Sequence, residues 1–243
     1  MDLDGVVWRG AASVPGAPEA VARLRAAGAP VAFVTNSALR TPAQVAEKLA
    51  SHGIPDAEPL VITAAMAAAS LVEPGSRVLA IGSEGLVDAL RRRGVELVHD
   101  GEADAVVVGI SMSFDYDDMT RAMRAIHGGA RFIATNTDST YPDTTGLLPG
   151  NGALVAAVAV AAGVEPEIAG KPHEPIAAFT RARLGDAGVM VGDRPDTDGL
   201  FAATLGYDFA LVLTGVVGPA DLPVEPAPQF VAADLATLVD QLI

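Results

Sequence analysis

Short apolar runs alternate along this chain with longer stretches in which apolar residues recur at helical spacing. Several of the runs are continuous and rich in Val, Ile and Phe, which is typical of strands buried on both faces of a parallel sheet. We predict strands at residues 30–35, 77–82, 103–109, 130–136, 188–192, 209–214 and 229–232. We predict helices between them at residues 17–27, 42–52, 85–93, 116–126, 152–163 and 175–184.

Glycines follow four of the predicted helices, at Gly28, Gly53, Gly94 and Gly163, and glycine readily takes the left-handed conformation that closes a helix. The alternation of strand and helix predicts an α/β fold with a mainly parallel sheet. The polar stretch 136–152 is predicted as the longest irregular segment, and long ordered loops often border a site.

Composition narrows the class of protein. The 243 residues are 50% hydrophobic and 19% charged, which suits one large or two modest domains with a sizeable core. The 30 acidic and 16 basic residues give a net charge of −14, which argues against nucleic acid or an anionic membrane as the main partner. With no cysteine, no secretory signal and no apolar window of about 18 residues, we expect a cytoplasmic protein.

The chain begins with two carboxylates two residues apart, Asp2 and Asp4, followed by Gly5. In extended backbone such side chains point to the same side, so we expect these two to converge on a small volume that suits Mg²⁺. An acidic turn at a frayed terminus is the alternative. If Asp2 closes a strand, almost none of that strand is present, and we expect the natural product to start a few residues upstream or the chain to be incomplete.

Two further segments carry polar residues able to contact an anion. The apolar run that begins at residue 31 ends in Thr35, Asn36 and Ser37, whose hydroxyls, amide and backbone N–H groups can cradle an anion, although the same residue types cap helices. Lys171 lies between a glycine and a proline just before a predicted helix. It can place a point charge on a phosphate, or it is simply solvated.

A fourth segment is the predicted strand 188–192, which runs into Asp193 and then into an acidic loop that holds Asp198. Asp193 is placed like a metal ligand, and Asp198 can reach the same site. The alternative is an Asp-rich helix start, which is favourable at the positive end of a helix dipole. Together the four segments fall at the ends of separate predicted strands, where open α/β sheets bind ligands. The four segments together indicate a binding site much more specifically than any one of them does.

In this combination the sequence resembles the haloacid dehalogenase superfamily, and more closely its NagD-like, class IIA branch of sugar and nucleotide phosphatases. The resemblance spans essentially the whole chain and rests on residues 2–10, 34–37, 146–152, 170–172 and 191–198. It implies a Rossmann-like parallel-sheet core at residues 1–65 and 168–243. It also implies an inserted α/β cap domain of the C2 type at residues 66–167.

The resemblance also implies a mechanism. Asp2 is then the nucleophile that forms an aspartyl-phosphate, and Asp4 protonates the leaving oxygen and later deprotonates the attacking water. Mg²⁺ is expected between the Asp2 carboxylate, the Asp4 backbone carbonyl and Asp193, with Asp198 orienting metal-bound water.

For the substrate, the resemblance implies that Thr35, Asn36 and Ser37 hold phosphate oxygens and that Lys171 neutralises charge on the nucleophile and the phosphoryl group. Asn136 and Asp138 follow a predicted cap strand, and we expect them to face the substrate. Trp8 is expected either to form a flap over the site with its neighbours or to be a core aromatic residue.

We therefore expect a Mg²⁺-dependent phosphomonoester hydrolase of small phosphorylated metabolites, such as glycerol 3-phosphate, phosphoglycolate or a sugar phosphate. A homodimer is compatible with this expectation. One alternative is a catalytically silent phosphate-binding module that regulates a partner. The other, an NAD-dependent oxidoreductase, needs Gly-x-Gly-x-x-Gly after the first strand, and no such segment stands there.

Overall fold

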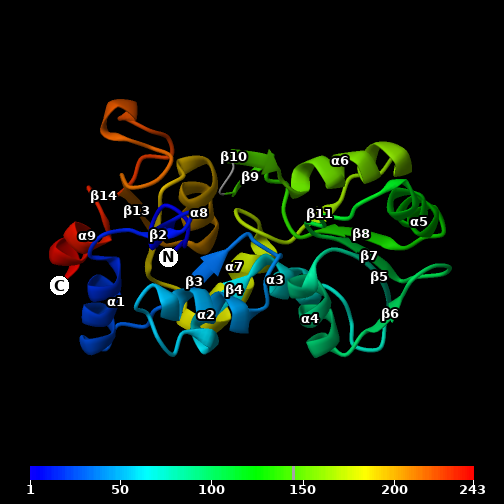
Figure 1. The fold of residues 1–243 in the computed structure, drawn as a ribbon, viewed down its shortest axis with the longest axis horizontal. Helices are drawn as coiled ribbons and strands as arrows, with labels where there is room; N and C mark the ends of the chain where they lie inside the picture. The colour runs from blue at the N-terminus through cyan, green and yellow to red at the C-terminus, as the bar shows by residue number, and fades with distance from the viewer. Residues whose placement is uncertain (144–145) are drawn as a thin grey trace. The chain divides into compact units, whose positions relative to one another are not determined.

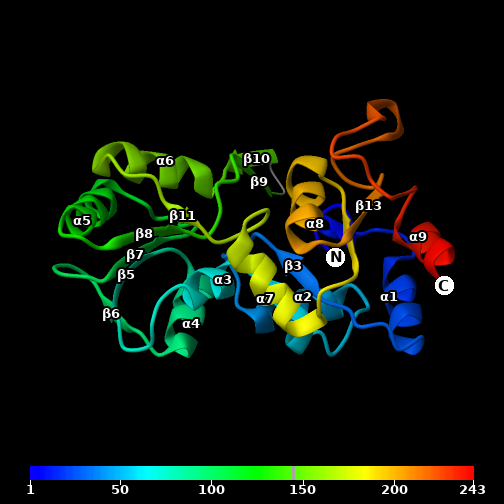
Figure 2. The same cartoon turned by 180° about the vertical axis from the view of Figure 1, so that it is seen from behind.

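The computed structural model describes residues 1–143 and 146–243, and the chain forms two compact units. The first unit consists of Met1–Thr35, Pro42–Ile62 and Lys171–Ile243, and the second unit of Asn36–Thr41 and Thr63–Gly170. Each unit combines parallel strands with helices (Figures 1 and 2), so the predicted α/β class is confirmed.

Short strands form the sheet of the first unit. They are β3 (Phe33–Thr35), β4 (Val61–Thr63), β12 (Val189–Gly192), β13 (Asp208–Val212) and β14 (Phe230–Ala232). β12, β13 and β14 pair in parallel, and β3 pairs with β4. The predicted strands at 188–192, 209–214 and 229–232 are confirmed to within two residues, whereas the strand at 30–35 begins three residues later.

The extended residues Met1 and Asp2 connect these two groups of strands. Met1 donates to the carbonyl of Ala32 and accepts from the N–H of Val34, both at 2.8 Å, which is the pattern of a parallel neighbour. The N–H of Asp2 donates to the carbonyl of Val191 at 2.8 Å. Asp2 therefore reaches the same edge of the sheet as the end of β12.

Helices and a hairpin complete the first unit. The hairpin pairs β1 (Trp8–Arg9) with β2 (Ala12–Ser13). The helices are α1 (Ala17–Ala26), α2 (Pro42–Ser51), α7 (Glu174–Leu184), α8 (Leu200–Leu205) and α9 (Leu235–Leu242), with single turns η1 (Glu58–Leu60), η2 (Pro195–Gly199) and η3 (Pro219–Asp221). Val21 of α1 and Leu238 of α9 pack into one apolar cluster with Phe33 and Ala210 of the sheet. Burying each large apolar side chain contributes roughly 1.5–3 kcal/mol.

The second unit is built on a five-stranded parallel sheet. Its strand order is β11 (Glu167–Ile168), β8 (Arg131–Ala134), β7 (Ala105–Val108), β5 (Arg77–Ile81) and β6 (Glu96–Val98). The helices are α3 (Ala64–Ser70), α4 (Glu84–Arg93), α5 (Tyr116–His127) and α6 (Asn151–Ala162). α5 and α6 pack on the face that carries Leu79 and Val106, and α3 and α4 lie on the other face (Figure 1).

The segment 136–152 differs from its prediction as an irregular loop. Among its described residues, β9 (Thr140–Asp143) pairs antiparallel with β10 (Gly146–Pro149), and α6 begins at Asn151. The strands of this hairpin have only four residues each, so they carry too few alternating positions to reveal their period in the sequence.

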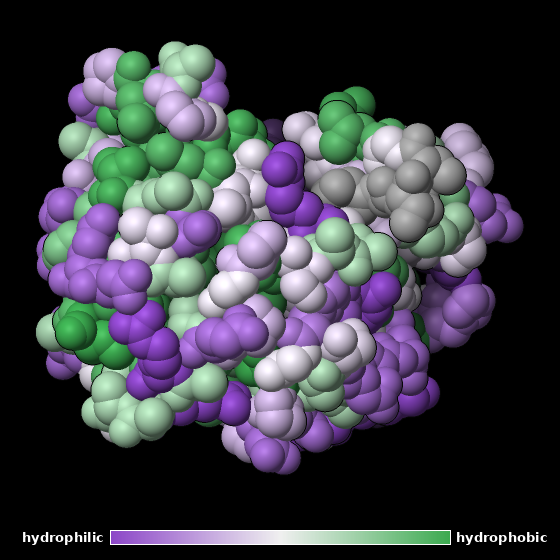
Figure 3. Space-filling model, turned by 60° about the vertical axis from the view of Figure 1, so that its left-hand side comes forward, coloured by the Kyte–Doolittle hydropathy of each residue, from purple (hydrophilic) through white to green (hydrophobic). Residues whose placement is uncertain are grey.

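Hydrophilic and hydrophobic residues are mixed over the face of the protein drawn in Figure 3. No helix among residues 1–143 and 146–243 combines the length and the apolar character needed to cross a bilayer. The glycines predicted to end helices all have positive φ, between 67° and 84°.

Candidate active site

Asp2, Asp193 and Asp198 form a cluster of carboxylates in the first unit. Each offers one oxygen, and these oxygens all lie within 4.8 Å of one another. Asp2 ends the first extended segment, Asp193 directly follows β12, and Asp198 lies in the turn η2. The fold thus brings together acids that are about 190 residues apart because parallel strands end at the same edge of the sheet.

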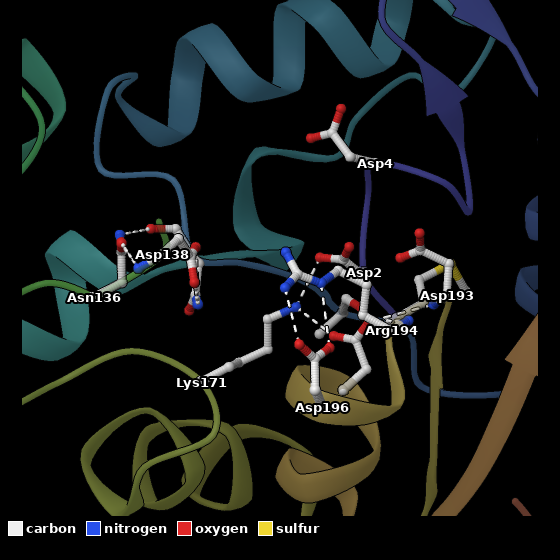
Figure 4. A network of polar contacts seen from close by, with 12 residues as sticks. Asp2, Asp4, Asn136, Asp138, Lys171, Asp193, Arg194 and Asp196 are labelled. Carbon is white, nitrogen blue, oxygen red and sulfur yellow. Dashed lines mark hydrogen bonds and ion pairs between the residues drawn. The ribbon is translucent and has the colours of Figure 1, made fainter. Parts of the chain in front are cut away.

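Lys171 lies between two of these acids. Its Nζ donates to Oδ1 of Asp2 and to Oδ1 of Asp198, each at 2.7 Å (Figure 4). The side chains of Lys171 and Asp198 are only 3% and 1% exposed, whereas that of Asp2 is 15% exposed. Burial alone would lower the pKa of Lys171, but the carboxylates of Asp198 and Asp2 outweigh burial and raise that pKa above its ordinary value. Lys171 is therefore held as a charged ammonium group.

The negative charge of Asp193 is compensated less than the charges of Asp2 and Asp198, both of which contact the ammonium group of Lys171. Burial, followed by the carboxylates of Asp2 and Asp198, raises the pKa of Asp193 to about 7. The N–H of Val216 donates to its Oδ2 at 2.8 Å and opposes this shift. A carboxylate with a pKa this high is only about half ionised at pH 7, and a further positive charge nearby would favour its ionised form.

Asp198 has a different environment. Its Oδ1 accepts from Lys171, and its Oδ2 accepts from the backbone N–H groups of Asp193 and Arg194, both at 3.3 Å. These contacts connect the turn η2 to the end of β12. Asp198 thereby fixes both the lysine and the start of the loop that carries Asp193.

The loop after β13 was not predicted as part of the site. The hydroxyl of Thr214 donates to the carbonyl of Gly5 at 2.6 Å, and Val216 binds Asp193 as described. A Cβ added at Gly215 would lie 1.9 Å from Oδ2 of Asp193. In the sequence, only the position of Thr214 at the end of a predicted strand pointed to this loop. Its contacts with Asp193 involve a backbone N–H group and require that Gly215 has no side chain, so the pattern of residue types does not reveal them.

Asp4 lies apart from the three clustered acids, contrary to the expectation that its carboxylate converges with that of Asp2 (Figure 4). The reason is local. The chain bends at Leu3, whose carbonyl accepts from the N–H groups of Val7 and Trp8, and Gly5 has a φ of +78°. The two-residue alternation of extended backbone therefore does not apply here. Oδ1 of Asp4 instead accepts from the indole Nε1 of Trp8 at 2.8 Å.

The polar residues after β3 divide between the units. Thr35 ends β3 in the first unit and is 6% exposed, while Asn36 and the exposed Ser37 belong to the second unit. Nδ2 of Asn36 lies 3.3 and 3.4 Å from the two carboxylate oxygens of Asp138, and Nδ2 of Asn136 donates to the carbonyl of Asn36 at 2.8 Å. Asn36, Asn136 and Asp138, all predicted to bind substrate, thus form one contact network in the second unit; Figure 4 labels Asn136 and Asp138.

The acid cluster fits a divalent cation. Three carboxylates and one ammonium group leave two uncompensated negative charges when all are ionised. Oxygen ligands at this spacing suit Mg²⁺, which prefers hard carboxylate donors and keeps several waters. Asp2 and Asp193 are the carboxylates suited to hold it directly, because both oxygens of Asp198 already accept hydrogen bonds.

Comparison with known proteins places these residues in context. A family model described as haloacid dehalogenase-like hydrolase matches residues 1–96, and a second model, described as HAD-hydrolase-like, matches residues 168–238. The chain is 42% identical over 223 residues to a 5′-nucleotidase from Bacillus subtilis, covering 89% of this chain and 86% of that protein. It is 37% identical over 235 residues to an acid sugar phosphatase from Staphylococcus epidermidis, covering 94% and 90%.

A solved structure is similar as well. The crystal structure of a glycerol phosphate phosphatase from Mycobacterium tuberculosis in complex with magnesium matches with a TM-score of 0.90 and 39% identity. The match covers 98% of this chain and 74% of that chain.

Proposed function

This chain belongs to the haloacid dehalogenase-like hydrolases, and from that premise we propose that it is a Mg²⁺-dependent phosphatase that forms an aspartyl-phosphate on Asp2. The observation that carries the proposal is the contact of Lys171 with both Asp2 and Asp198 beside Asp193. An ammonium group and a divalent cation around a carboxylate are what an attack on an anionic phosphate requires.

Asp2 is the acid best placed to be the nucleophile. Its side chain is 15% exposed, whereas that of Asp198 is 1% exposed and Asp193 as a whole residue is 3% exposed. A substrate phosphorus atom can approach Asp2 more readily than the other two acids. Two negative charges about 4 Å apart repel by about 4 kcal/mol at an effective dielectric constant near 20, and Lys171 offsets part of that repulsion.

Asp2, Asp193 and the backbone carbonyl of Asp4 would hold Mg²⁺. The ion, when bound, supplies charge neutralisation at the phosphate oxygens and at the attacking carboxylate. Asp198 contributes by holding Lys171 and the backbone at Asp193.

The reaction has two steps. In the first, an oxygen of Asp2 forms a bond to phosphorus while the bond to the leaving oxygen breaks, and Asp4 gives its proton to that oxygen. In the second, Asp4 takes a proton from water, whose oxygen attacks phosphorus and releases inorganic phosphate and the Asp2 carboxylate. Thr35, Asn36 and Ser37 are proposed to bind the phosphate oxygens.

We propose the second unit as the cap of the enzyme. Its described boundaries at Thr63 and Gly170 are close to the residues 66–167 expected for the cap, with 1–65 and 168–243 as the core. The contact network of Asn36, Asn136 and Asp138 supports a role in substrate binding.

The proposed substrates are small phosphorylated metabolites, with preference for a polyol or carboxylate phosphate such as glycerol 3-phosphate or phosphoglycolate, or for a sugar phosphate. Relatives named for a nucleotide, a sugar phosphate and glycerol phosphate support the class of phosphomonoesters. The net charge of −14 supports a partner other than nucleic acid or an anionic membrane. We also propose a cytoplasmic location, and a homodimer is compatible with the proposal.

The test is the release of phosphate from a panel of about 100 phosphorylated metabolites with Mg²⁺, ranked by kcat/KM. We expect hydrolysis of several small phosphomonoesters that is lost on chelation of Mg²⁺ and in Asp2→Asn. Binding of phosphate esters without turnover would contradict the proposal and indicate a silent binding module.

A further inference from the structure

Asp4 is an exposed carboxylate whose orientation matters for the proposed reaction. It lies in the turn between the first extended segment and the β1–β2 hairpin, and its side chain is exposed to solvent. An exposed side chain samples several rotamers unless a partner holds it. The partner in this structure is Nε1 of Trp8, which donates to Oδ1 of Asp4 at 2.8 Å. This hydrogen bond restricts the rotamers that the Asp4 side chain can adopt.

Trp8 is held rigidly from several sides. It is only 3% exposed, and it packs in the apolar cluster of the first unit. Its backbone N–H donates to the carbonyl of Leu3 at 3.2 Å, its carbonyl accepts from the N–H of Gly5 at 2.7 Å, and it pairs with Ser13 across the hairpin. The indole therefore presents its N–H from a fixed position to a residue that is otherwise free to turn.

A second layer of residues fixes the indole ring itself. The ring of His52 stacks with it at a centroid distance of 5.1 Å, and Nζ of Lys48 lies 3.9 Å from the ring centroid. Burial and then the charge of Lys48 lower the pKa of His52, which favours the neutral form of its ring. Oγ of Ser13 lies 2.6 Å from Nδ1 of His52, which fixes the histidine in turn.

A purely structural tryptophan needs only some acceptor for its buried N–H group. The acceptor here is instead the exposed carboxylate that follows the proposed nucleophile by two residues. We propose that Trp8 is a positioning residue for the reaction: its Nε1 holds the carboxylate of Asp4 in the orientation from which Asp4 protonates the leaving oxygen. This inference rests on the proposed function, and the burial of Trp8 in the apolar cluster favours the core aromatic residue over the flap that was its alternative.

The dependence of the rate on the leaving group tests this role. An alkyl phosphate such as glycerol 3-phosphate expels a strongly basic alkoxide and needs a proton from Asp4, whereas p-nitrophenyl phosphate expels an anion that is stable near neutral pH. Trp8→Phe removes the N–H donor and keeps an aromatic ring. We expect it to lower kcat/KM roughly tenfold for glycerol 3-phosphate and to leave kcat/KM for p-nitrophenyl phosphate within about twofold. Equal losses for both substrates, or no loss for either, would overturn the inference.

Two further variants distinguish a wrong assignment of Asp4 as the acid from a wrong role for Trp8. Asp4→Asn should show the same selectivity more strongly, by about 10²–10⁴-fold for the alkyl phosphate. If Asp4→Asn is not selective, the proposed acid is wrong and the inference fails with it. If Asp4→Asn is selective and Trp8→Phe is not, only the inference fails. Val239→Ala, which removes two methyl groups from a fully buried side chain of α9 in the same apolar cluster, is the control for general destabilisation and should affect both substrates equally.

A measurement independent of activity completes the test. Trp8 is the only tryptophan of the chain, so its indole N–H gives a single resonance in an ¹H–¹⁵N NMR spectrum. We expect this proton to be protected from exchange with solvent in the unmodified protein and to exchange at least about tenfold faster in Asp4→Ala. An unchanged exchange rate and chemical shift in Asp4→Ala would show that the hydrogen bond is absent in solution and would overturn the inference.

Discussion

The Nζ atom of Lys171 lies 2.7 Å from Oδ1 of Asp198, and both side chains are almost fully buried. A buried ion pair is strongly destabilised when one partner is removed, because the remaining charge has no compensation. This pair also connects the loop before α7 with the turn η2, which are 27 residues apart. The pair therefore contributes both to the stability of the first unit and to the shape of its acid cluster.

We predict that Lys171→Met lowers the free energy of unfolding of the metal-free protein by about 3–5 kcal/mol. It should also lower kcat by about 10²–10³-fold with Mg²⁺ present, because the charge that offsets repulsion at Asp2 is lost. Urea unfolding and steady-state kinetics measure the two effects. The matched control is Arg23→Ala, which removes the exposed ion pair with Asp240 and should change stability by no more than about 1 kcal/mol. Similar stabilities of the two variants would contradict the prediction.

Gly215→Ala should weaken binding of Mg²⁺. The added Cβ would lie 1.9 Å from Oδ2 of Asp193, so the carboxylate of Asp193 or the loop must shift, which disturbs the hydrogen bond from Val216 to Asp193. We expect the dissociation constant of Mg²⁺, measured by calorimetry, to rise by about tenfold or more, as for the loss of other residues that orient a metal ligand.

The control lies in the same loop. A Cβ added at Gly218 would meet only Oδ2 of Asp221, at an ordinary contact distance of 3.6 Å. Gly218→Ala should therefore bind Mg²⁺ as the unmodified protein does. If both alanine variants bind Mg²⁺ equally well, the contact between Gly215 and Asp193 does not shape the metal site.

Binding of Mg²⁺ should release a proton from Asp193 in a pH-dependent way. Burial and the neighbouring carboxylates raise the pKa of Asp193 to about 7 in the metal-free protein, and only its ionised form binds the cation. Calorimetry in buffers of different ionisation enthalpy should show release of close to one proton at pH 6 and about a tenth of a proton at pH 8. Affinity for Mg²⁺ should rise as the pH increases through 7.

Asp4→Asn is the control for proton release, because the carboxylate of Asp4 lies outside the acid cluster. It should release protons as the unmodified protein does. Release of almost no proton at either pH in the unmodified protein would show that Asp193 is already ionised before the cation binds, and release of a full proton at both would place its pKa well above 7; either result would contradict the prediction.

The sequence allowed the sheet and the acids at its edge to be predicted because long apolar runs define strands and their ends. The strand predicted at 188–192 is β12, and Asp193 follows it directly. Asp2 and Lys171 were also predicted to contribute to one site. In the fold Lys171 contacts both Asp2 and Asp198, and Asp2 lies in one carboxylate cluster with Asp193 and Asp198. Parallel strands end on one side of a sheet, so a prediction of strand ends is also a prediction of proximity.

Other features of the fold depend on contacts that leave no periodic pattern of apolar and polar residues in the sequence. The hairpin of β9 and β10 and the strand β6 have four residues or fewer per strand, too few to show alternation. The bend at Leu3, which turns Asp4 away from Asp2, results from hydrogen bonds to the Leu3 carbonyl. The loop at Thr214 acts through a backbone N–H group and through the missing side chain of Gly215, and neither has a signature in the pattern of residue types.

The central claim is that Asp2 becomes phosphorylated during turnover. The most direct test is to quench the enzyme with acid while it hydrolyses a phosphomonoester in the presence of Mg²⁺, to reduce the acyl phosphate with borohydride, and to analyse the N-terminal peptide by mass spectrometry. We predict homoserine in place of aspartate at position 2, seen only with substrate and absent in Asp2→Asn, which should be inactive. Unmodified Asp2 in an enzyme that is turning over, or hydrolysis retained by Asp2→Asn, would contradict the account.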